Sequence, residues 1–140
     1  MKLVVDTNVF IESISPGSLL HPLFKSLLDG EFSIFVNEIL LEYEEVISLR
    51  CKPETRRLFL SFLETSPFVV KVIPNYRFGL VTSDPDDNKF VDCAVAANAD
   101  FIVTRDRHFN VLTSITFPKV AVISPQNYIK HYLRNPRAAG

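Results

Sequence analysis

The chain has 140 residues, of which 47% are hydrophobic and 22% charged, and its formal net charge is −1. These values are typical of one soluble globular domain, which at this length can build its core without disulfides. No apolar run approaches the length of a membrane span, and the short apolar start ends at an acid, so we expect no signal peptide. Cys51 and Cys93 fit neither a zinc motif nor a disulfide framework. We expect them to be small buried hydrophobes in a reducing cytoplasm.

Short apolar strands alternate with helical segments in the first half of the chain. We expect strands over residues 2–5 and 32–36, helical turns over 9–13, and helices over 18–29, 37–49 and 53–66. Ser18 and Asn37 are good caps for the second and third helical segments, and Pro53 suits the start of the fourth. The pattern indicates an α/β fold with helices on both faces of a parallel sheet.

The second half of the chain continues the alternation after a long connection. We expect strands over residues 68–73, 101–104 and 120–123, and helices over 86–98 and 125–134, with a frayed tail at 135–140. The connection over residues 74–86 contains two prolines and one glycine. Loops of this length in compact domains are often functional or mobile.

Two of the expected strands run directly into aspartates. Asp6 follows the first strand, and Asp106 follows the strand over 101–104 after Thr104 and Arg105. Ligands of parallel α/β sheets bind beyond the carboxyl ends of the strands, so neighbouring strands would bring both carboxylates to one crevice. Each aspartate alone is equally well explained as a helix cap or turn residue.

Glu42 differs from the other glutamates of its helix by its position on the helical wheel. At 100° per residue it falls inside the apolar arc that includes Ile39, Tyr43, Val46 and Leu49. A half-buried carboxylate needs a partner, because burying an isolated charge is costly. The partner could be a metal ion or a base in a partly buried salt bridge.

The helix over residues 86–98 and the residues around its start offer four more acids. Asp92 interrupts an otherwise apolar stretch, so it is either paired or a ligand, and we favour the functional interpretation. Asp84, Asp86 and Asp87 precede the helix, where acids commonly serve capping and the helix dipole. For Asp87 we therefore favour capping.

Four acids converging without histidine or cysteine would suit a hard cation, because Mg²⁺ and Mn²⁺ prefer oxygen ligands. Such an ion polarises a phosphodiester and generates hydroxide near neutral pH. The three histidines have no metal-like spacing. His108 is close enough in sequence to Asp106 to contact a substrate.

These residues occur in four segments that resemble the motifs of the PIN-domain ribonucleases, specifically the toxins of toxin–antitoxin systems. The four segments, in chain order, are Val4–Phe10, Glu38–Tyr43, Asp86–Ala94 and Phe101–Asp106. The resemblance extends from residue 2 to about residue 132. One motif would be weak evidence, whereas four in order at suitable spacing are strong evidence.

The resemblance implies a three-layer α/β/α fold with a central, roughly five-stranded parallel sheet, formed as one PIN-like domain over residues 1–134. It also implies that Asp6, Glu42, Asp92 and Asp106 are the catalytic residues and hold Mg²⁺ or Mn²⁺. The positions that support the metal or its ligands match Asn8, Thr104 and Asp87. The implied activity is hydrolysis of RNA phosphodiester bonds by a metal-activated water. The implied partners are an antitoxin protein and a second copy of the chain in a homodimer.

Basic residues near these acids are weaker candidates, because for any single one we favour the explanation as solvated surface charge. The candidates for contact with RNA phosphates are Arg105, Arg107, Lys89 and Lys52. Two alternative functions remain open. One is a different metal-dependent phosphoryl hydrolase, and the other is a non-catalytic PIN-like module that binds RNA or protein.

Overall fold

The computed structural model describes residues 1–81 and 85–133. Its centre is a five-stranded parallel sheet in the order β3-β2-β1-β4-β5. The strands are β1 (Lys2–Val5), β2 (Ser33–Val36), β3 (Val69–Lys71), β4 (Phe101–Val103) and β5 (Val122–Ile123). The prediction of a parallel, roughly five-stranded α/β sheet is confirmed, although most strands are shorter than expected.

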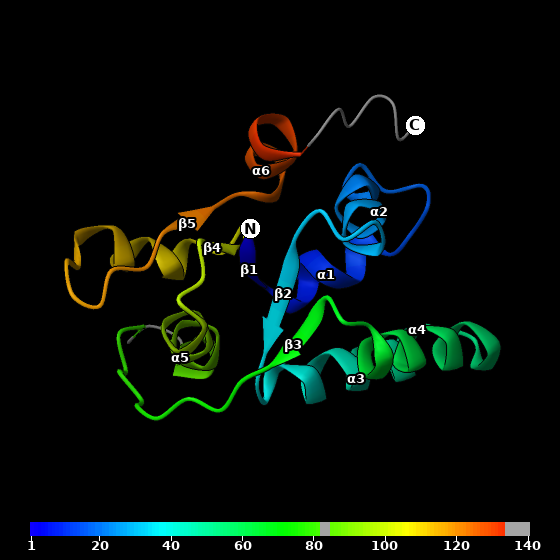
Figure 1. Cartoon of the computed structure of the whole chain (residues 1–140), viewed down its shortest axis with the longest axis horizontal. Helices are drawn as coiled ribbons and strands as arrows, with labels where there is room; N and C mark the ends of the chain where they lie inside the picture. Colours follow the sequence, from blue (N-terminus) through cyan, green and yellow to red (C-terminus); the bar gives the residue numbers. More distant parts are fainter. Residues whose placement is uncertain (82–84, 134–140) are drawn as a thin grey trace.

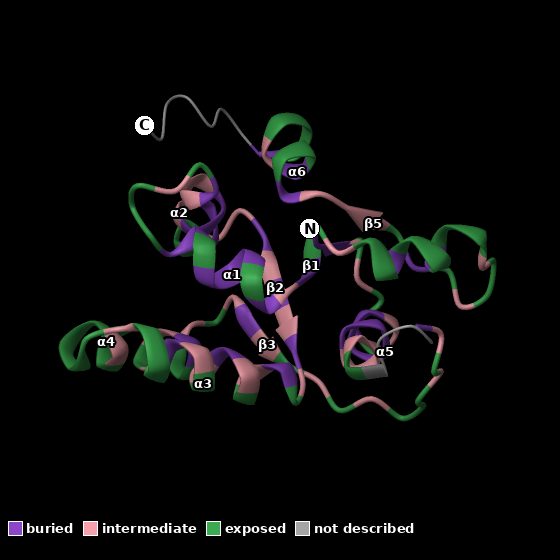
Figure 2. Ribbon diagram, turned by 180° about the vertical axis from the view of Figure 1, so that it is seen from behind, coloured by how far each residue is buried: buried purple, intermediate pink, exposed green. Residues whose placement is uncertain are grey.

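Helices cover both faces of this sheet (Figure 1). They are α1 (Thr7–Ser13), α2 (His21–Leu28), α3 (Ile39–Arg50), α4 (Pro53–Thr65), α5 (Asn88–Ala97) and α6 (Pro125–Tyr132), with 3₁₀ segments η1 (Pro85–Asp87) and η2 (Arg107–Ser114). The α5 helix packs on β1, β2 and β4 from one side, and α1 to α4 lie on the other (Figure 1). Buried residues are concentrated in the strands and in the helix faces turned toward them (Figure 2).

The alternation of strands and helices fixes the direction of each helix. Because all five strands are parallel, a helix that connects two of them must run back from the carboxyl edge of the sheet to its amino edge. The α5 helix precedes β4, so it begins at the carboxyl edge and ends at the amino edge. There Asp100 accepts a hydrogen bond from the Lys2 backbone nitrogen (2.7 Å).

Several local signals in the sequence have the structural effect that was predicted, with shifted boundaries. Asn37 does not occupy the cap position of α3, but its side-chain oxygen accepts a hydrogen bond from the Ile39 backbone nitrogen (2.9 Å). Gly30 has a φ of 76° after α2, and a Cβ at this position would come within 2.5 Å of the Phe68 ring. Both the backbone conformation and the close approach therefore require glycine.

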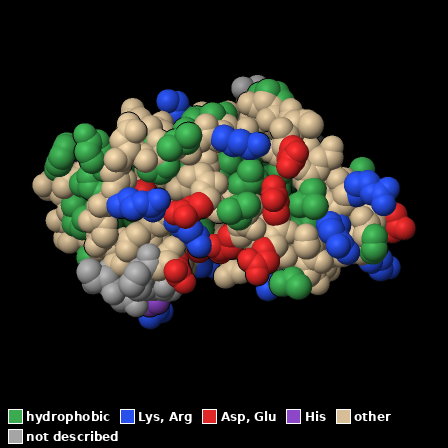
Figure 3. Space-filling view, turned by 90° about the horizontal axis from the view of Figure 1, so that it is seen from below, with side chains coloured by type: hydrophobic (Ala, Val, Ile, Leu, Met, Phe, Trp, Pro, Cys, Tyr) green, Lys and Arg blue, Asp and Glu red, His purple; other side chains and the backbone are tan. Residues whose placement is uncertain are grey.

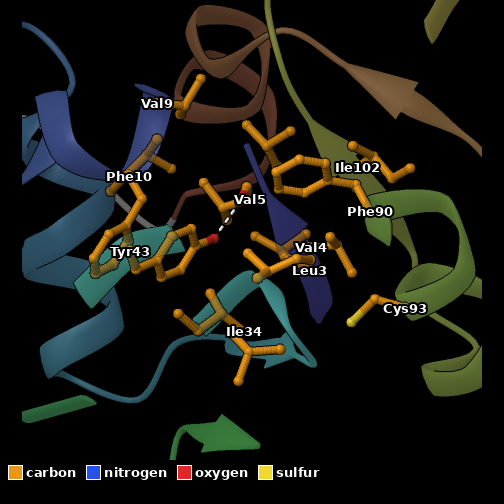
Figure 4. Close-up of a cluster of buried hydrophobic side chains, with 14 of the residues drawn as sticks. Leu3, Val4, Val5, Val9, Phe10, Ile34, Tyr43, Phe90, Cys93 and Ile102 are labelled. Atoms are coloured by element: carbon orange, nitrogen blue, oxygen red, sulfur yellow. Dashed lines mark hydrogen bonds between the residues drawn. The ribbon is translucent and has the colours of Figure 1, made fainter. Parts of the chain in front are cut away.

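The core is centred on β1 and its neighbours (Figure 4). The Tyr43 ring of α3 is fully buried and stacks on Phe10 of α1, with 4.5 Å between ring centroids. The Tyr43 hydroxyl donates a hydrogen bond to the Val5 carbonyl, drawn as a dashed line in Figure 4. The end of β1, one residue before Asp6, is thereby tied to α3.

Within residues 1–81 and 85–133 the structure contains no helix that is both long and apolar enough to cross a membrane. Asp84 and the expected tail at 135–140 lie outside the described residues, as does Arg134, the last residue of the expected final helix.

The buried hydroxyl of Tyr43 gives a first testable prediction. Tyr43→Phe should lower the free energy of unfolding by about 1–2 kcal/mol, because the Val5 carbonyl loses a buried donor. Urea denaturation followed by circular dichroism measures this. Tyr76→Phe, at an exposed position, is the matched control, and equal stability of the two variants would contradict the role assigned to Tyr43.

Candidate metal centre

The carboxyl ends of β1 and β4 bring two predicted acids together through one hydroxyl. Val5 and Val103 are register partners, and the Asp6 backbone nitrogen donates to the Val103 carbonyl (3.0 Å). The buried Thr104 hydroxyl donates to an Asp6 carboxylate oxygen (2.7 Å) and accepts from the Asp106 backbone nitrogen (3.0 Å). Thr104 therefore fixes the Asp6 side chain and the Asp106 backbone at the same edge of the sheet.

Asp106 in turn belongs to a tight group with Asp87 and His108. One potential ligand atom from each of these three side chains lies within 4.8 Å of the others. The His108 Nδ1 is 3.3 Å from an Asp106 oxygen and 3.7 Å from an Asp87 oxygen. Asp106 also caps η2 by accepting from the His108 backbone nitrogen (2.9 Å). Helix capping is the alternative explanation of Asp106 that the sequence allows. Asp106 does cap η2, and it also lies beside Asp87 and His108.

Glu42 approaches the group from α3. The buried face of that helix consists of Ile39, Tyr43 and Ile47, and Glu42 lies half-buried at its border. Its carboxylate forms an ion pair with the Lys89 ammonium. The base that the sequence left unidentified is therefore Lys89 of α5. Leu49, which the wheel placed within the apolar arc, is instead 79% exposed.

The charges in this region affect one another through a partly dehydrated environment. Burial raises the pKa of the Asp6 carboxyl above its ordinary value of 3.8, and the hydrogen bond from Thr104 lowers it. The negative charges of Asp106 and Glu42 raise the same pKa further. Asp6, Asp106 and Glu42 are thus electrostatic neighbours, and acidic side chains gather in the middle of the face in Figure 3.

Asp92, the acid that the sequence analysis favoured on α5, is not among the three residues grouped with Asp106 in the described part of the chain. Its side chain is 3% exposed, and one carboxylate oxygen accepts from the Phe78 backbone nitrogen (3.0 Å). Asn88, one turn earlier, makes two hydrogen bonds with the Val81 backbone, at 2.8 and 3.0 Å. This face of α5 holds the connection between β3 and α5, and Asp87 is the acid of this region that lies beside Asp106.

The physical reason follows from helix geometry. Five residues separate Asp87 from Asp92, which amounts to about 7.5 Å of rise and about 140° of rotation. Since α5 starts at the carboxyl edge of the sheet, only its beginning lies beside Asp106. A helix between two parallel strands must start at the carboxyl edge of the sheet. The sequence alone therefore indicates that Asp87, at the start of this helix, lies nearer to Asp106 than Asp92 does.

The remaining predicted residues are exposed or form contacts of their own. Asn8 is exposed and lines a cleft of about 740 Å³ together with Glu12 and Phe59. Arg105 forms an ion pair with Glu12. Arg107 is exposed at the start of η2, and Lys52, also exposed, precedes α4.

The donor chemistry of the acids at the carboxyl edge, together with His108, fits a hard divalent cation. Asp6, Asp87, Asp106 and Glu42 offer carboxylate oxygens, the ligands preferred by Mg²⁺ and Mn²⁺, and His108 adds an imidazole nitrogen that Mn²⁺ tolerates. A cation would also relieve the repulsion that raises the pKa of Asp6.

Comparison with known proteins agrees with this fold. A family model described as PIN domain matches residues 2–108. The crystal structure of FitAcB from Neisseria gonorrhoeae is similar, with a TM-score of 0.55 and 17% identity over 90% of this chain and 99% of that chain. The structure of FitAB bound to an IR36 DNA fragment has a TM-score of 0.54 and 17% identity, over 96% and 99% of the two chains. At this identity the likeness shows the fold, and no curated protein matched.

The raised pKa of Asp6 gives a prediction for the metal-free protein. Folding makes this carboxyl hold its proton more tightly, so its contribution favours the folded state below pH 3.8 and is lost as the pH rises through the raised value. In EDTA, Asp6→Asn should therefore melt at a higher temperature than the wild type at pH 7, and this advantage should shrink toward pH 3.8. Thermal denaturation across pH measures this.

The exposed Glu64 on α4 supplies the control. Glu64→Gln should leave the melting temperature unchanged at both ends of the pH range. An Asp6→Asn variant less stable than the wild type at pH 7 would show that the ionised carboxylate stabilises the fold, contrary to this account.

Proposed function

Because the chain belongs to the PIN domain family, we propose that it is a metal-dependent endoribonuclease that hydrolyses RNA phosphodiester bonds with Mg²⁺ or Mn²⁺. The single observation that supports this most is the meeting of Asp6, Asp87 and Asp106 at the carboxyl edge of the sheet. Carboxylates from three distant segments have no structural need to share one region. Their convergence suits the binding of a divalent ion.

Asp87, Asp106 and Asp6 would hold the ion, with Glu42 beside them. When bound, the ion supplies polarisation of the phosphodiester and a water of lowered pKa. Thr104 keeps the Asp6 carboxylate oriented, since its hydroxyl proton is committed to that side chain. His108 is half-exposed next to Asp87 and Asp106, which places its imidazole where an incoming strand would pass.

RNA as the substrate rests on the resemblance of the four sequence motifs to PIN-domain ribonucleases. The chain offers cations for a phosphate backbone around the acids, because Arg107 is exposed at the start of η2 and Lys89 lies in the first turn of α5. Phosphate contacts of this kind position a strand without reading its sequence. The cleft beside Asn8 adds room for a neighbouring nucleotide.

The test is a cleavage assay on purified protein with single-stranded RNA, single-stranded DNA and a phosphomonoester, in Mn²⁺, Mg²⁺ or EDTA. We expect metal-dependent cleavage of RNA. Asp6→Asn and Asp87→Asn should reduce it by at least about a hundredfold, because each removes a charged ligand. Asp92→Asn is the matched control on the same helix and should stay close to the wild-type rate, since an amide oxygen can still accept from Phe78.

Each other outcome has a definite meaning. Loss of activity in Asp92→Asn with normal folding, together with full activity in Asp87→Asn, would reverse the assignment of the α5 acid. Cleavage that survives in both Asp6→Asn and Asp87→Asn would indicate a contaminating nuclease. Silence toward every substrate would favour a binding module, and turnover of the phosphomonoester alone would indicate a phosphatase.

We further propose that the chain is a toxin restrained by an antitoxin protein and that it pairs as a homodimer in the cytoplasm. One of the similar structures is FitAB bound to a DNA fragment, and the cleft of this chain is lined by Asn8 and by Glu12, the partner of Arg105. A protein segment seated there would obstruct a strand bound at the site. Exposed apolar side chains such as Leu49 and Leu58 on α3 and α4 suit a protein–protein surface.

Expression in a bacterial host checks the toxin proposal. The wild-type chain should slow growth and degrade cellular RNA, and Asp6→Asn, expressed at equal level, should do neither. Undiminished growth with active purified enzyme would contradict the toxin assignment. Light scattering should give about twice the 15.9 kDa chain mass, and a monomeric mass would contradict the homodimer.

A further inference from the structure

Lys89 occupies an unusual position for a surface lysine. Its ammonium pairs with Glu42, and the two side chains are only 22% and 33% exposed. The side-chain nitrogen of Asn37 donates to the Lys89 carbonyl (3.0 Å), which ties the first turn of α5 to the end of β2. The ammonium also lies 5.7 Å from the centroid of the Phe90 ring. The lysine is therefore held in place by its backbone and along its side chain.

The charge around this lysine is strongly negative. Glu42 is an electrostatic neighbour of Asp6, and Asp6 of Asp106. Asp106 is grouped with Asp87. Arg105, the arginine adjacent to Asp106 in sequence, is engaged with Glu12 instead. Lys89 thus brings a positive charge to the acids, through its pairing with Glu42.

We propose that Lys89 is an exchangeable cation of this site: it neutralises Glu42 in the metal-free protein, releases Glu42 to the metal, and then binds a phosphate of the RNA. This inference rests on the proposed function. A lysine suits such an exchange, because its ammonium is a compact charge on a flexible stem and makes no bidentate contact with a carboxylate. Partial exposure keeps the ion pair weak enough to be broken.

The exchange has two measurable consequences. A divalent ion must compete with the ammonium for Glu42, so Lys89 lowers the affinity of the site for metal. Once released, the ammonium remains tethered beside the acids, where it is a donor for a phosphate oxygen and contributes to cleavage. A purely structural salt bridge would produce neither effect.

The experiment compares Lys89→Met with the wild type and with Lys119→Met, an exposed lysine before β5, as the matched control. Calorimetric titration with MnCl₂ alone should show roughly fivefold tighter binding to Lys89→Met and no change in Lys119→Met. In a Glu42→Gln background Lys89→Met should no longer change the Mn²⁺ affinity. At saturating Mn²⁺, Lys89→Met should lower kcat/KM for single-stranded RNA about tenfold, and Lys89→Arg should restore most of it.

Unchanged or weaker Mn²⁺ binding by a folded Lys89→Met protein would overturn the exchange. Tighter binding with an undiminished kcat/KM would overturn the phosphate contact. If the wild type cleaves no RNA with any metal, the proposed function fails and the phosphate contact fails with it. The titration still decides whether Lys89 and the metal compete for Glu42, because it needs no catalysis.

Discussion

The hydroxyl of Thr104 determines how the carboxyl edge of the sheet is organised. A hydroxyl has one proton, and here it accepts from the Asp106 backbone nitrogen and donates to the Asp6 carboxylate. If this proton turned elsewhere, the Asp6 carboxylate would lose its hydrogen bond from Thr104. The contact exists only because β1 and β4 are neighbours in register, with Val5 beside Val103. The pairing of two short buried strands thus sets the distance between two acids that are far apart in sequence.

This arrangement is electrostatically costly without cations. Burial and two acidic neighbours raise the pKa of Asp6, which means that its charged form is disfavoured in the folded state. The ion pair of Lys89 with Glu42 offsets part of this cost. A site assembled for a divalent ion cannot be optimal for stability in its absence, which is a common conflict between function and stability.

The sequence predicted those parts of the site that depend on strand ends. Asp6, Thr104 and Asp106 follow apolar strands, and the carboxyl ends of parallel strands must meet at one edge. Glu42 could be singled out by its place on the helical wheel, but its partner could not. Lys89 comes from α5, on the other face of the sheet, and it reaches Glu42 at the carboxyl edge, where Asn37 also contacts the Lys89 carbonyl. The order and spacing of side chains do not show which residues from opposite faces of a sheet meet at its edge.

Asp87 and Asp92 show how much of the environment of an acid the apolar pattern leaves open. An acid inside an apolar helix indicates that a buried partner exists, but it does not identify that partner. For Asp92 it is a backbone amide of the connection that precedes α5, where Asn88 also binds. An acid at a helix start seems explained by capping, so its functional value is easily discounted. Asp87 and Asp106 both cap or flank a helical segment and still have carboxylate oxygens within 4.8 Å of each other, because segments that begin at the carboxyl edge start where the ligands bind. In this fold an acid at a capping position on that edge is therefore a candidate site residue. The direction of the chain shows which acids lie at the edge, and the apolar pattern does not.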